Sequence, residues 1–395
     1  MEADGSRMYQ GSTSLTERTV IPVTDPGAQY LALRPQIDAA IRRVLDRGYY
    51  ILGPEVEAFE GEFATYIGTK FAIGVANGTD ALSLALRALS IGPGDEVITV
   101  SHTAVATVAA IEQSGAIPVL VDVEPGFLTL DPALLNEALT DRTRAVVPVH
   151  IYGQAADILR IQSFCRNHGL ALVEDVSQAH GATWGQARLG SFGDISIFSC
   201  YPTKNLGALG DAGIVVTNDL ALANRVRRLR QYGWVDRNSS TEPGVNSRLD
   251  ELQAAVLRVK LEHLDANNDQ RRRIATSYSE AFRGLGIEVP EVREGAESVF
   301  HLYVAQVDNR DSLRNRLDTA GVQTAIHYPM PIHRQPGYLG RVRTIGSMSV
   351  TDHAAGRIVS LPMFPELPEE DVDLVIQSLA GVYSGHLRDR GSNSG

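Results

Sequence analysis

The chain has 395 residues, a formal net charge of -11, and 44% hydrophobic residues. This length suits a large domain plus a smaller one, and the composition is that of an ordinary globular protein. The negative charge argues against a nucleic-acid-binding surface, although a local basic pocket for an anionic substrate stays open. The two cysteines, Cys165 and Cys200, show neither CxxC nor zinc spacing, so we expect free thiols and no metal site.

The two ends of the chain look loose. Residues 1–25 begin with a polar stretch that lacks the hydrophobic region of a signal peptide, and residues 386–395 are rich in small and charged side chains. We expect a flexible leader and a flexible tail there. No apolar stretch of membrane-spanning length interrupts the sequence. The expectation is therefore a cytoplasmic protein that binds neither a membrane nor nucleic acid.

The predicted elements begin with two helices, one from about Gln29 with apolar residues at 3–4 residue spacing and one over residues 55–66. Short β-rich runs then alternate with amphipathic segments. Strands are predicted over 71–75, 96–100, 118–123, 145–149, 170–173, 195–198 and 213–217, and helices over 81–89, 104–114, 132–139 and 158–167. This alternation predicts right-handed crossovers and a mostly parallel, seven-stranded sheet covered on both faces.

The pattern changes after Leu220. A basic helix over 220–230 leads through a Gly/Ser/Asn-rich loop at 233–247 into a long helical stretch with charges on its outer faces. Strands and helices alternate again near residues 298–307. We therefore predict a large domain over residues 26–250 and a smaller C-terminal α/β domain over residues 251–385.

The strongest chemical signal is an acid and a lysine that follow two predicted strands. Asp175 closes an apolar run in EDVSQAHGA, and Lys204 lies in a glycine-rich loop after a second run, in IFSCYPTKNLGALGDAG. Ligands bind beyond the carboxyl ends of strands in open α/β sheets. A lysine there can form an imine with the aldehyde of pyridoxal phosphate, and a carboxylate can keep the pyridine nitrogen protonated. The alternatives are a helix N-cap for Asp175 and a solvated surface lysine for Lys204.

A phosphate site is expected at Asn77-Gly78-Thr79, directly after a strand and at the start of a helix. Backbone N–H groups and the Thr79 hydroxyl would bind an anion there, and Gly78 allows its close approach. Ser199 supplies a further hydroxyl. The alternative is an ordinary N-capping turn without a ligand.

Together these segments resemble the DegT/DnrJ/EryC1/StrS family of sugar aminotransferases, which have the aspartate aminotransferase fold (fold type I). The motifs G-T-D-A-L, E-D-x-S-Q-A-H-G-A, Y-P-T-K-N-L-G-x-L-G-D-x-G and N-x-R-L-D-E-L-Q-A-A stand in order along the chain. The resemblance runs from about Val23 to Tyr383. It implies that pyridoxal 5′-phosphate is the cofactor and that pyridoxamine phosphate is formed during the reaction.

The resemblance also assigns roles by position. Lys204 is implied to be the Schiff-base lysine, Asp175 the partner of the pyridine nitrogen, and Gln178 a neighbour of the ring oxygen. Gly78, Thr79 and Ser199 are implied to bind the phosphate. Asn246 is implied to reach the phosphate of the neighbouring subunit, which makes a homodimer with shared active sites the expected assembly.

The chain departs from the family pattern at one position. Many members carry an aromatic residue over the pyridine ring where this chain has Ala104, in VSHTAVATVAAI. His102 is a candidate for the ring contact instead. The alternative for His102 is a loop histidine that does not touch the cofactor.

The implied reaction is transamination, in which L-glutamate gives its amino group to a keto sugar. The segment RQYGWVDR most resembles members that aminate C-3 of a dTDP-3-keto-6-deoxyhexose in antibiotic or cell-surface deoxysugar biosynthesis. Arg237, Arg248 and Arg334 are candidates for meeting the pyrophosphate. The predicted substrate contacts are Tyr232, Trp234, Arg248, His327 and Tyr328.

Other functions stay open at the level of the sequence. They include an aminotransferase that acts at C-4 of a nucleotide sugar or on a cyclitol ketone. A dehydratase of the same superfamily is disfavoured, because known examples replace the lysine with histidine. A non-catalytic regulatory homologue is the remaining alternative, and the intact Asp175 and Lys204 argue against it.

Overall fold

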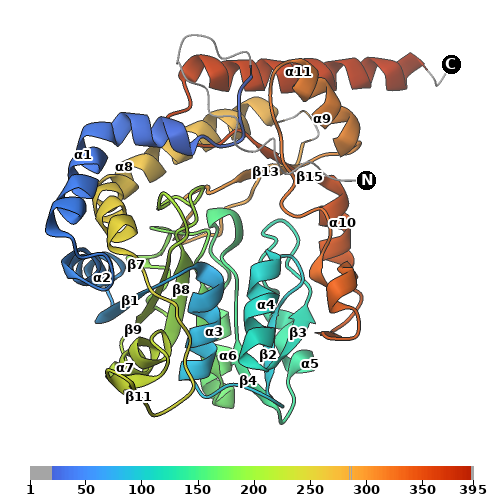
Figure 1. Ribbon diagram of the computed structural model, residues 1–395. Coiled ribbons are helices and arrows are strands. Elements are labelled where there is room, and N and C mark those ends of the chain that lie inside the picture. Colours follow the sequence, from blue (N-terminus) through green and yellow to red (C-terminus); the bar gives the residue numbers. More distant parts are fainter. Residues whose placement is uncertain (1–19, 284, 286, 393–395) are drawn as a thin grey trace.

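The computed structural model describes residues 20–283, 285 and 287–392. Its central element is an eight-stranded sheet in the order β1-β9-β8-β5-β4-β2-β3-β14, which is parallel except where β9 pairs with its two neighbours (Figure 1). Its strands are β1 Phe71–Val75, β2 Glu96–Val100, β3 Ile117–Val121, β4 Thr143–Val146, β5 Ala171–Asp175, β8 Ile195–Ser199, β9 Gly213–Thr217 and β14 Arg343–Thr344. The predicted mostly parallel sheet is therefore confirmed, but the expected count of seven strands is wrong. β14 adds an eighth strand beside β3, from a segment only two residues long with no strand signal.

Helices cover both faces of this sheet, as the alternation of strands and helices predicts. The helices between the strands are α3 Gly78–Ala88, α4 Val105–Ser114, α5 Leu135–Ala138, α6 Ile158–His168 and α7 Leu220–Leu229. The helix predicted over 132–139 is instead a 3-10 turn at Pro132–Leu134 followed by α5. β4 ends two residues before Pro148, which has no N–H group to donate to a neighbouring strand.

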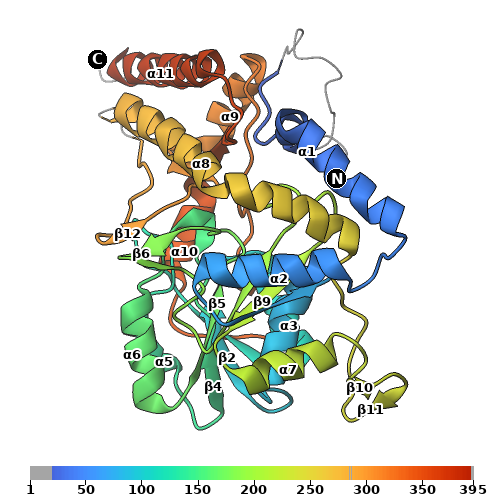
Figure 2. The same cartoon turned by 90° about the vertical axis from the view of Figure 1, so that its left-hand side faces the viewer.

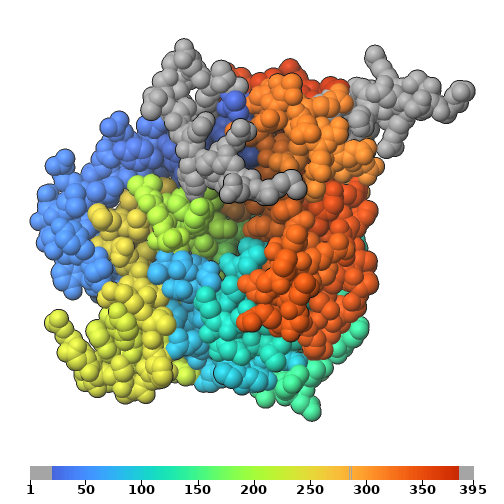
Figure 3. Space-filling model, turned by 45° about the vertical axis from the view of Figure 1, so that its right-hand side comes forward, coloured from blue at the N-terminus to red at the C-terminus, as the bar shows by residue number. Residues whose placement is uncertain are grey.

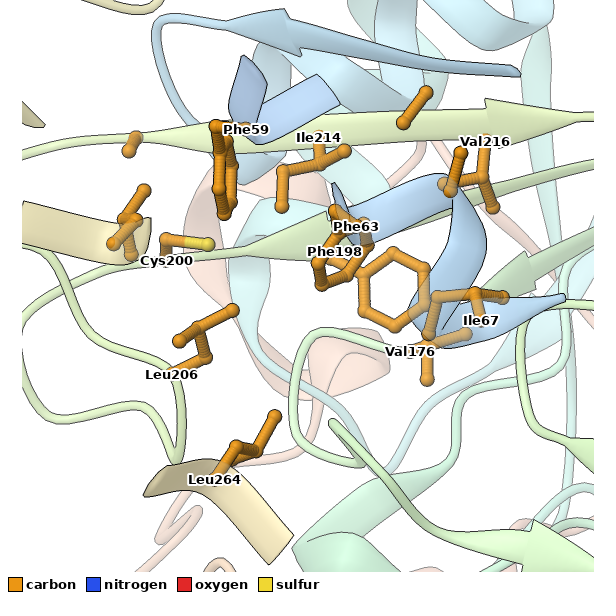
Figure 4. Close-up of a cluster of buried hydrophobic side chains, with 14 of the residues drawn as sticks. Phe59, Phe63, Ile67, Val176, Phe198, Cys200, Leu206, Ile214, Val216 and Leu264 are labelled. Carbon is orange, nitrogen blue, oxygen red and sulfur yellow. The ribbon is translucent and has the colours of Figure 1, made fainter. Parts of the chain in front are cut away.

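Aromatic side chains form the core between the sheet and α2 (Pro54–Ile67). Figure 4 shows Phe63 next to Phe198 of β8, and these two rings meet edge to face with centroids 5.0 Å apart. The centroid of the Phe59 ring lies 5.7 Å from that of Phe63. Leu206, from the loop after β8, and Leu264 belong to the same cluster. The loop that carries Lys204 therefore lies on a packed apolar base.

The other half of the molecule is a smaller layer of helices on an antiparallel strand pair. It contains β13 Tyr303–Gln306, β15 Ile358–Leu361, α9 Arg310–Thr319, α10 Ser349–Arg357 and α11 Glu369–Ser392. The long helix α8 (Glu251–Phe282) crosses between the two halves, with α1 (Pro26–Arg47) and α2 beside one end and α11 beside the other (Figure 2). Figure 3 shows C-terminal residues, in orange and red, lying against the teal segment around α4. Ile332 and Met348 pack there on Val108 and Leu120.

The two expected loose ends differ from the prediction where they are described. Ile21 is buried and exchanges backbone hydrogen bonds with Gly321 and Gln323, so residues 20–25 are fixed to the smaller half. α11 continues through Ser392, which makes most of the expected tail helical. Residues 1–19 and 393–395 lie outside the described part. Within that part, none of the helices has the length and apolar character needed to cross a membrane.

Candidate active site

Asp175 and Lys204 lie at the carboxyl end of the sheet, where β5 and β8 finish side by side. β5 pairs with β8 so that Asp175 is opposite Ile197, two residues before the end of β8. Asp175 is 5% exposed, and its carboxylate accepts hydrogen bonds from the Thr107 hydroxyl (3.0 Å) and the Ser177 N–H (3.1 Å). It does not cap a helix. Its bonds fix the carboxylate while leaving it room to accept a further donor.

Thr107 is a site residue that the sequence analysis missed. It lies in α4, and its hydroxyl also meets that of Thr103 one turn earlier, at 3.0 Å. Two threonines four residues apart, such as Thr103 and Thr107, can also simply be packing residues at the start of a helix that lies against a sheet. Nothing in the local pattern distinguishes it from core packing.

The Lys204 amine is held in a setting that disfavours its charge. Burial lowers its pKa to about 8, although the nearby Asp175 carboxylate and the Cys200 thiol act in the opposite direction. An amine with this pKa is partly neutral near physiological pH, and the neutral form is the nucleophile and the proton acceptor. Lys204 is half-buried, so it is not a fully solvated surface lysine.

The loop after Lys204 returns tightly to the sheet, as its glycines predict. The Ala208 N–H donates to the Cys200 carbonyl, and a Cβ placed on Gly207 would lie 2.4 Å from the Pro202 carbonyl oxygen. Only glycine fits this position. The close return fixes the turn from which Lys204 projects.

The start of α3 and the end of β8 form a small cradle. A Cβ on Gly78 would lie 2.6 Å from the Ser199 Cβ, so only a glycine lets the helix start approach this strand. Asn77 caps α3 by accepting from the Asp80 N–H, at 2.8 Å. The first N–H groups of the helix, at Gly78 and Thr79, have no partner within the helix and are oriented to bind an anion.

These observations fit pyridoxal phosphate. The cradle of Gly78, Thr79 and Ser199 suits a phosphate, the fixed Asp175 carboxylate suits a protonated ring nitrogen, and the Lys204 amine suits the aldehyde. The three groups come from neighbouring ends of one sheet. The family resemblance implied these roles by position in the sequence, and the fold brings the residues to one place.

Gln178 belongs to a hydrogen-bonded network that spans both halves of the molecule. Its side-chain oxygen accepts from the Tyr152 N–H (2.7 Å), and its amide donates to the Tyr328 hydroxyl (3.0 Å). The Tyr152 hydroxyl in turn donates to the His327 carbonyl. His327 and Tyr328, both predicted substrate contacts, are thereby placed next to Gln178. Tyr152, whose φ is 62°, was not predicted from the sequence.

His102 is buried beside the same network. Its Nε2 lies 2.6 Å from the Tyr152 hydroxyl, and because that hydroxyl donates to His327, Nε2 carries the hydrogen. Burial lowers the pKa of His102 to about 4, with Asp122 acting weakly in the opposite direction. The imidazole is therefore neutral at physiological pH. The contact between His102 and the cofactor ring stays a prediction.

The other predicted site residues lie on a separate hairpin and its flank. Tyr232 and Trp234 stack obliquely at 5.1 Å near the start of the hairpin formed by β10 (Trp234–Asp236) and β11 (Ser239–Ser240), at the edge of the larger half in Figure 2. Asn246 is exposed and Arg248 is half-buried. In the part of the chain that the structure describes, no hydrogen bond joins these four residues to Asp175 or Lys204. Arg334, an alternative for the pyrophosphate, pairs instead with Asp352.

Comparisons with known proteins agree with this geometry. A family model described as the DegT/DnrJ/EryC1/StrS aminotransferase family matches residues 32–380. The "Erythromycin biosynthesis sensory transduction protein EryC1" of Saccharopolyspora erythraea is 49% identical over 360 residues, which cover 91% of this chain and 98% of the relative. The "dTDP-3-amino-3,4,6-trideoxy-alpha-D-glucose transaminase" of Streptomyces venezuelae is 46% identical over 368 residues, which cover 93% and 97%.

Solved structures share both the fold and the cofactor chemistry. The structure of S. venezuelae DesV in complex with a ketimine intermediate superposes with a TM-score of 0.90 at 46% identity, and the match covers 92% of this chain and 98% of DesV. The structure of ntda from Bacillus subtilis with bound cofactor pmp has a TM-score of 0.86 at 31% identity, with coverage of 93% and 86%. The chain therefore belongs to the DegT/DnrJ/EryC1/StrS aminotransferase family, and it is a pyridoxal phosphate-dependent aminotransferase.

Proposed function

We propose that the protein transfers the amino group of L-glutamate to C-3 of a nucleotide-linked keto-deoxysugar, with a dTDP-3-keto-6-deoxyhexose as the preferred acceptor. The observation that carries the reaction type is the fixed Asp175 carboxylate, the low-pKa Lys204 amine and the Gly78–Ser199 cradle at one end of the sheet. Deoxysugar biosynthesis is the pathway class that consumes such a product.

Each of the site residues has its own role in the proposed reaction. Bound pyridoxal phosphate supplies an aldehyde and an electron-accepting ring. Asp175 would keep a proton at the ring nitrogen. Lys204, once its amine is free, would take the proton from the donor's α-carbon as general base and deliver it as general acid to C4′, the aldehyde carbon of the cofactor. The phosphate would be bound by the N–H groups of Gly78 and Thr79 and by the Ser199 hydroxyl. This anchoring would hold the ring within reach of Lys204.

The acceptor is inferred from the names of relatives. Two transaminases, at 46% and 44% identity, are named for dTDP-3-amino-3,4,6-trideoxy-α-D-glucose, and a third, at 43%, for a dTDP-3-amino-3,6-dideoxygalactose. A relative at 44% identity is named for UDP-N-acetyl-3-dehydro-α-D-glucosamine. These names agree on amination at C-3 and differ in nucleotide and sugar.

A homodimer with shared sites is part of the proposal. Tyr49, Tyr50 and Ile51 are 40–55% exposed and adjoin the start of α8, where the Glu251 N–H donates to the Tyr50 carbonyl. Leu209, on the lysine loop, is 41% exposed beside the same end of α8. Such an apolar group is typical of an interface. A second copy there would bring its exposed Asn246 towards the phosphate cradle, as the family motif implies.

The cellular setting is also proposed. Cys165 and Cys200 are both free and buried, which suits a reducing cytoplasm.

One experiment tests the reaction and the acceptor together. Purified protein is incubated with pyridoxal phosphate, L-glutamate and, separately, dTDP-3-keto-6-deoxyhexose, a dTDP-4-keto-6-deoxyhexose and a cyclitol ketone. The proposal expects an aminated product from the 3-keto sugar with 2-oxoglutarate formed in equal amount. Amination of only the 4-keto sugar or the cyclitol would overturn the acceptor, and no 2-oxoglutarate from any of them would overturn the catalytic assignment.

A further inference from the structure

Asn268 of α8 joins the two segments that carry Asp175 and Lys204. Its amide group donates to the His180 carbonyl (2.9 Å), and its side-chain oxygen accepts from the Asn205 amide (2.8 Å). His180 follows Asp175 in one motif, and Asn205 directly follows Lys204 in the other. Asn268 is 1% exposed, so water does not compete for these bonds.

The approach of Asn268 also explains the glycine of the A-H-G-A motif. Gly181 has a φ of +87°, and a Cβ on it would lie 2.5 Å from the Tyr66 hydroxyl of α2 and 2.7 Å from the Asn268 side-chain nitrogen. A side chain at this position would push both α2 and α8 away from the segment after Asp175. The glycine therefore serves the contact with α8 as well as the turn.

Two more side chains of α8 hold the same loop farther along. The Lys260 amine donates to the Gly207 carbonyl (2.7 Å), and the Gln253 side-chain oxygen accepts from the Leu209 N–H (2.8 Å). Leu209, Gly207 and Asn205 are two residues apart along the loop. Their partners Gln253, Lys260 and Asn268 are seven and eight residues apart along α8. At 3.6 residues per turn, the three side chains fall within roughly 80° of the helix circumference. They form one polar stripe.

Lys260 has no role in the reaction as described, although it is buried beside the active-site loop. It is 1% exposed, burial lowers its pKa to about 8, and no carboxylate lies within ion-pair distance of it among the described residues. A buried amine without an anionic partner is costly. Its hydrogen bond to the Gly207 carbonyl ties it to the lysine loop.

Asn205 extends the stripe to the smaller half of the molecule. Its amide also donates to the Val299 carbonyl (3.1 Å), and because an amide oxygen can only accept, Nδ1 of His301 donates to its side-chain oxygen (3.1 Å). The residue next to Lys204 is thus bonded to α8 and to the segment that enters β13. A shift of α8 or of the segment before β13 would therefore also shift Lys204.

We propose that Gln253, Lys260 and Asn268 are positioning residues for transamination, and that together they hold the loop of residues 205–209 so that Lys204 faces the ring held by Asp175. They touch no reacting atom. Their effect is on the orientation of Lys204, and a misplacement of about 1 Å at a reacting group can cost on the order of a hundredfold in rate.

The test compares Lys260→Met, Asn268→Asp and Gln253→Leu with two matched controls. Gln253→Glu keeps an acceptor for the Leu209 N–H and should restore what Gln253→Leu loses. Val256→Ala removes apolar contact between the same helix and Leu33 and Ile37 of α1, without touching the loop. It reports the effect of a loosened α8 alone.

Three measurements separate positioning from stability. They are hydrogen exchange at residues 205–209, the affinity of the apoprotein for pyridoxal phosphate, and kcat with KM for L-glutamate. The stripe variants should exchange faster in this loop, bind the cofactor more weakly, and lose on the order of 10- to 100-fold in kcat with little change in KM. Gln253→Glu and Val256→Ala should stay close to the parent in all three.

The proposal is overturned if the stripe variants lower only the melting temperature, the result expected of Val256→Ala, and leave loop exchange and kcat unchanged. It is also overturned if Gln253→Glu is as impaired as Gln253→Leu. Gln253 is half-exposed at the end of the stripe, so its variants are expected to fold. The comparison of Gln253→Leu with Gln253→Glu therefore still decides the question if Lys260→Met and Asn268→Asp fail to fold.

Discussion

Lys204 is an amine whose reactivity is set by its surroundings. Replacing it with alanine removes the only group proposed to capture the cofactor aldehyde and move the donor's proton. Lys204→Ala should therefore abolish both turnover and the visible absorbance of the bound cofactor, while the circular dichroism spectrum and the assembly state stay unchanged. A variant that kept full transaminase activity would remove Lys204 from the mechanism.

The lowered pKa of Lys204 predicts a pH dependence. Because burial brings the pKa from 10.5 to about 8, the neutral amine becomes the main form above pH 8. The rate at which the apoprotein captures pyridoxal phosphate should rise roughly tenfold per pH unit below that value and level off above it. Stopped-flow absorbance measures this rate. A rise that continued to pH 10 would show an ordinary, solvated lysine.

Gly78 tests the cradle without changing any reactive group. The new Cβ of Gly78→Ala would need to displace Ser199, which lies at 2.6 Å from it. We expect pyridoxal phosphate to bind at least about tenfold more weakly, or about 1.4 kcal/mol. Titration of the apoprotein gives the affinity. Ala76→Ser, on the same strand-to-helix connection, serves as a control that should leave the affinity unchanged.

At the scale of elements, the start of α8 holds the start of α2. Glu251 is fully buried, and its carboxylate accepts from the N–H groups of Gly53, Glu55 and Val56 at 2.8–3.0 Å. The N-cap residue of α2 is Gly53, which has no side chain to do this. The glutamate of the R-L-D-E-L-Q motif is thus a helix cap supplied from about 200 residues away in the chain.

Glu251→Gln measures that contact. The amide keeps the shape but turns a donor towards the Glu55 N–H, so one bond is lost and the charge disappears. The free energy of unfolding should fall by about 2–3 kcal/mol, with the urea dependence of unfolding unchanged. Glu262 is exposed on the same helix, so Glu262→Gln should leave the free energy of unfolding unchanged within the error of the measurement.

The elements themselves were largely predictable because their signals are local. Buried strands such as β1, β2 and β9 consist mostly of apolar residues, and their bounds agree with the prediction. β14 was not predictable, because Arg343–Thr344 has no apolar pattern and pairs only because the chain returns to β3. The four-residue helix α5 was also too short for a periodic signal.

At the scale of the whole molecule, the proposed dimer makes each site depend on two chains. Lys204→Ala and Asn246→Ala should each be inactive alone if Asn246 completes the partner's phosphate site. Mixing them after subunit exchange should restore about a quarter of the parent activity, because half of the dimers are mixed and each mixed dimer has one intact site. Failure to restore activity, with mixed dimers shown by mass spectrometry, would place Asn246 outside the shared site.

The reaction type could be predicted from the sequence, although each residue also had a structural alternative. Asp175, Lys204, Gly78 and Ser199 are marked by residue type and by their places at strand ends, which are local properties, and by the order of four motifs along the chain. The partners that hold those residues became visible only in the folded chain. Thr107 on Asp175, Tyr152 beside Gln178, and the α8 stripe on the loop after Lys204 are hydrogen bonds between segments separated by 26 to 68 residues. Such partners carry no periodicity or spacing of their own, so only the packed chain reveals that Asn268 joins the acid and the lysine.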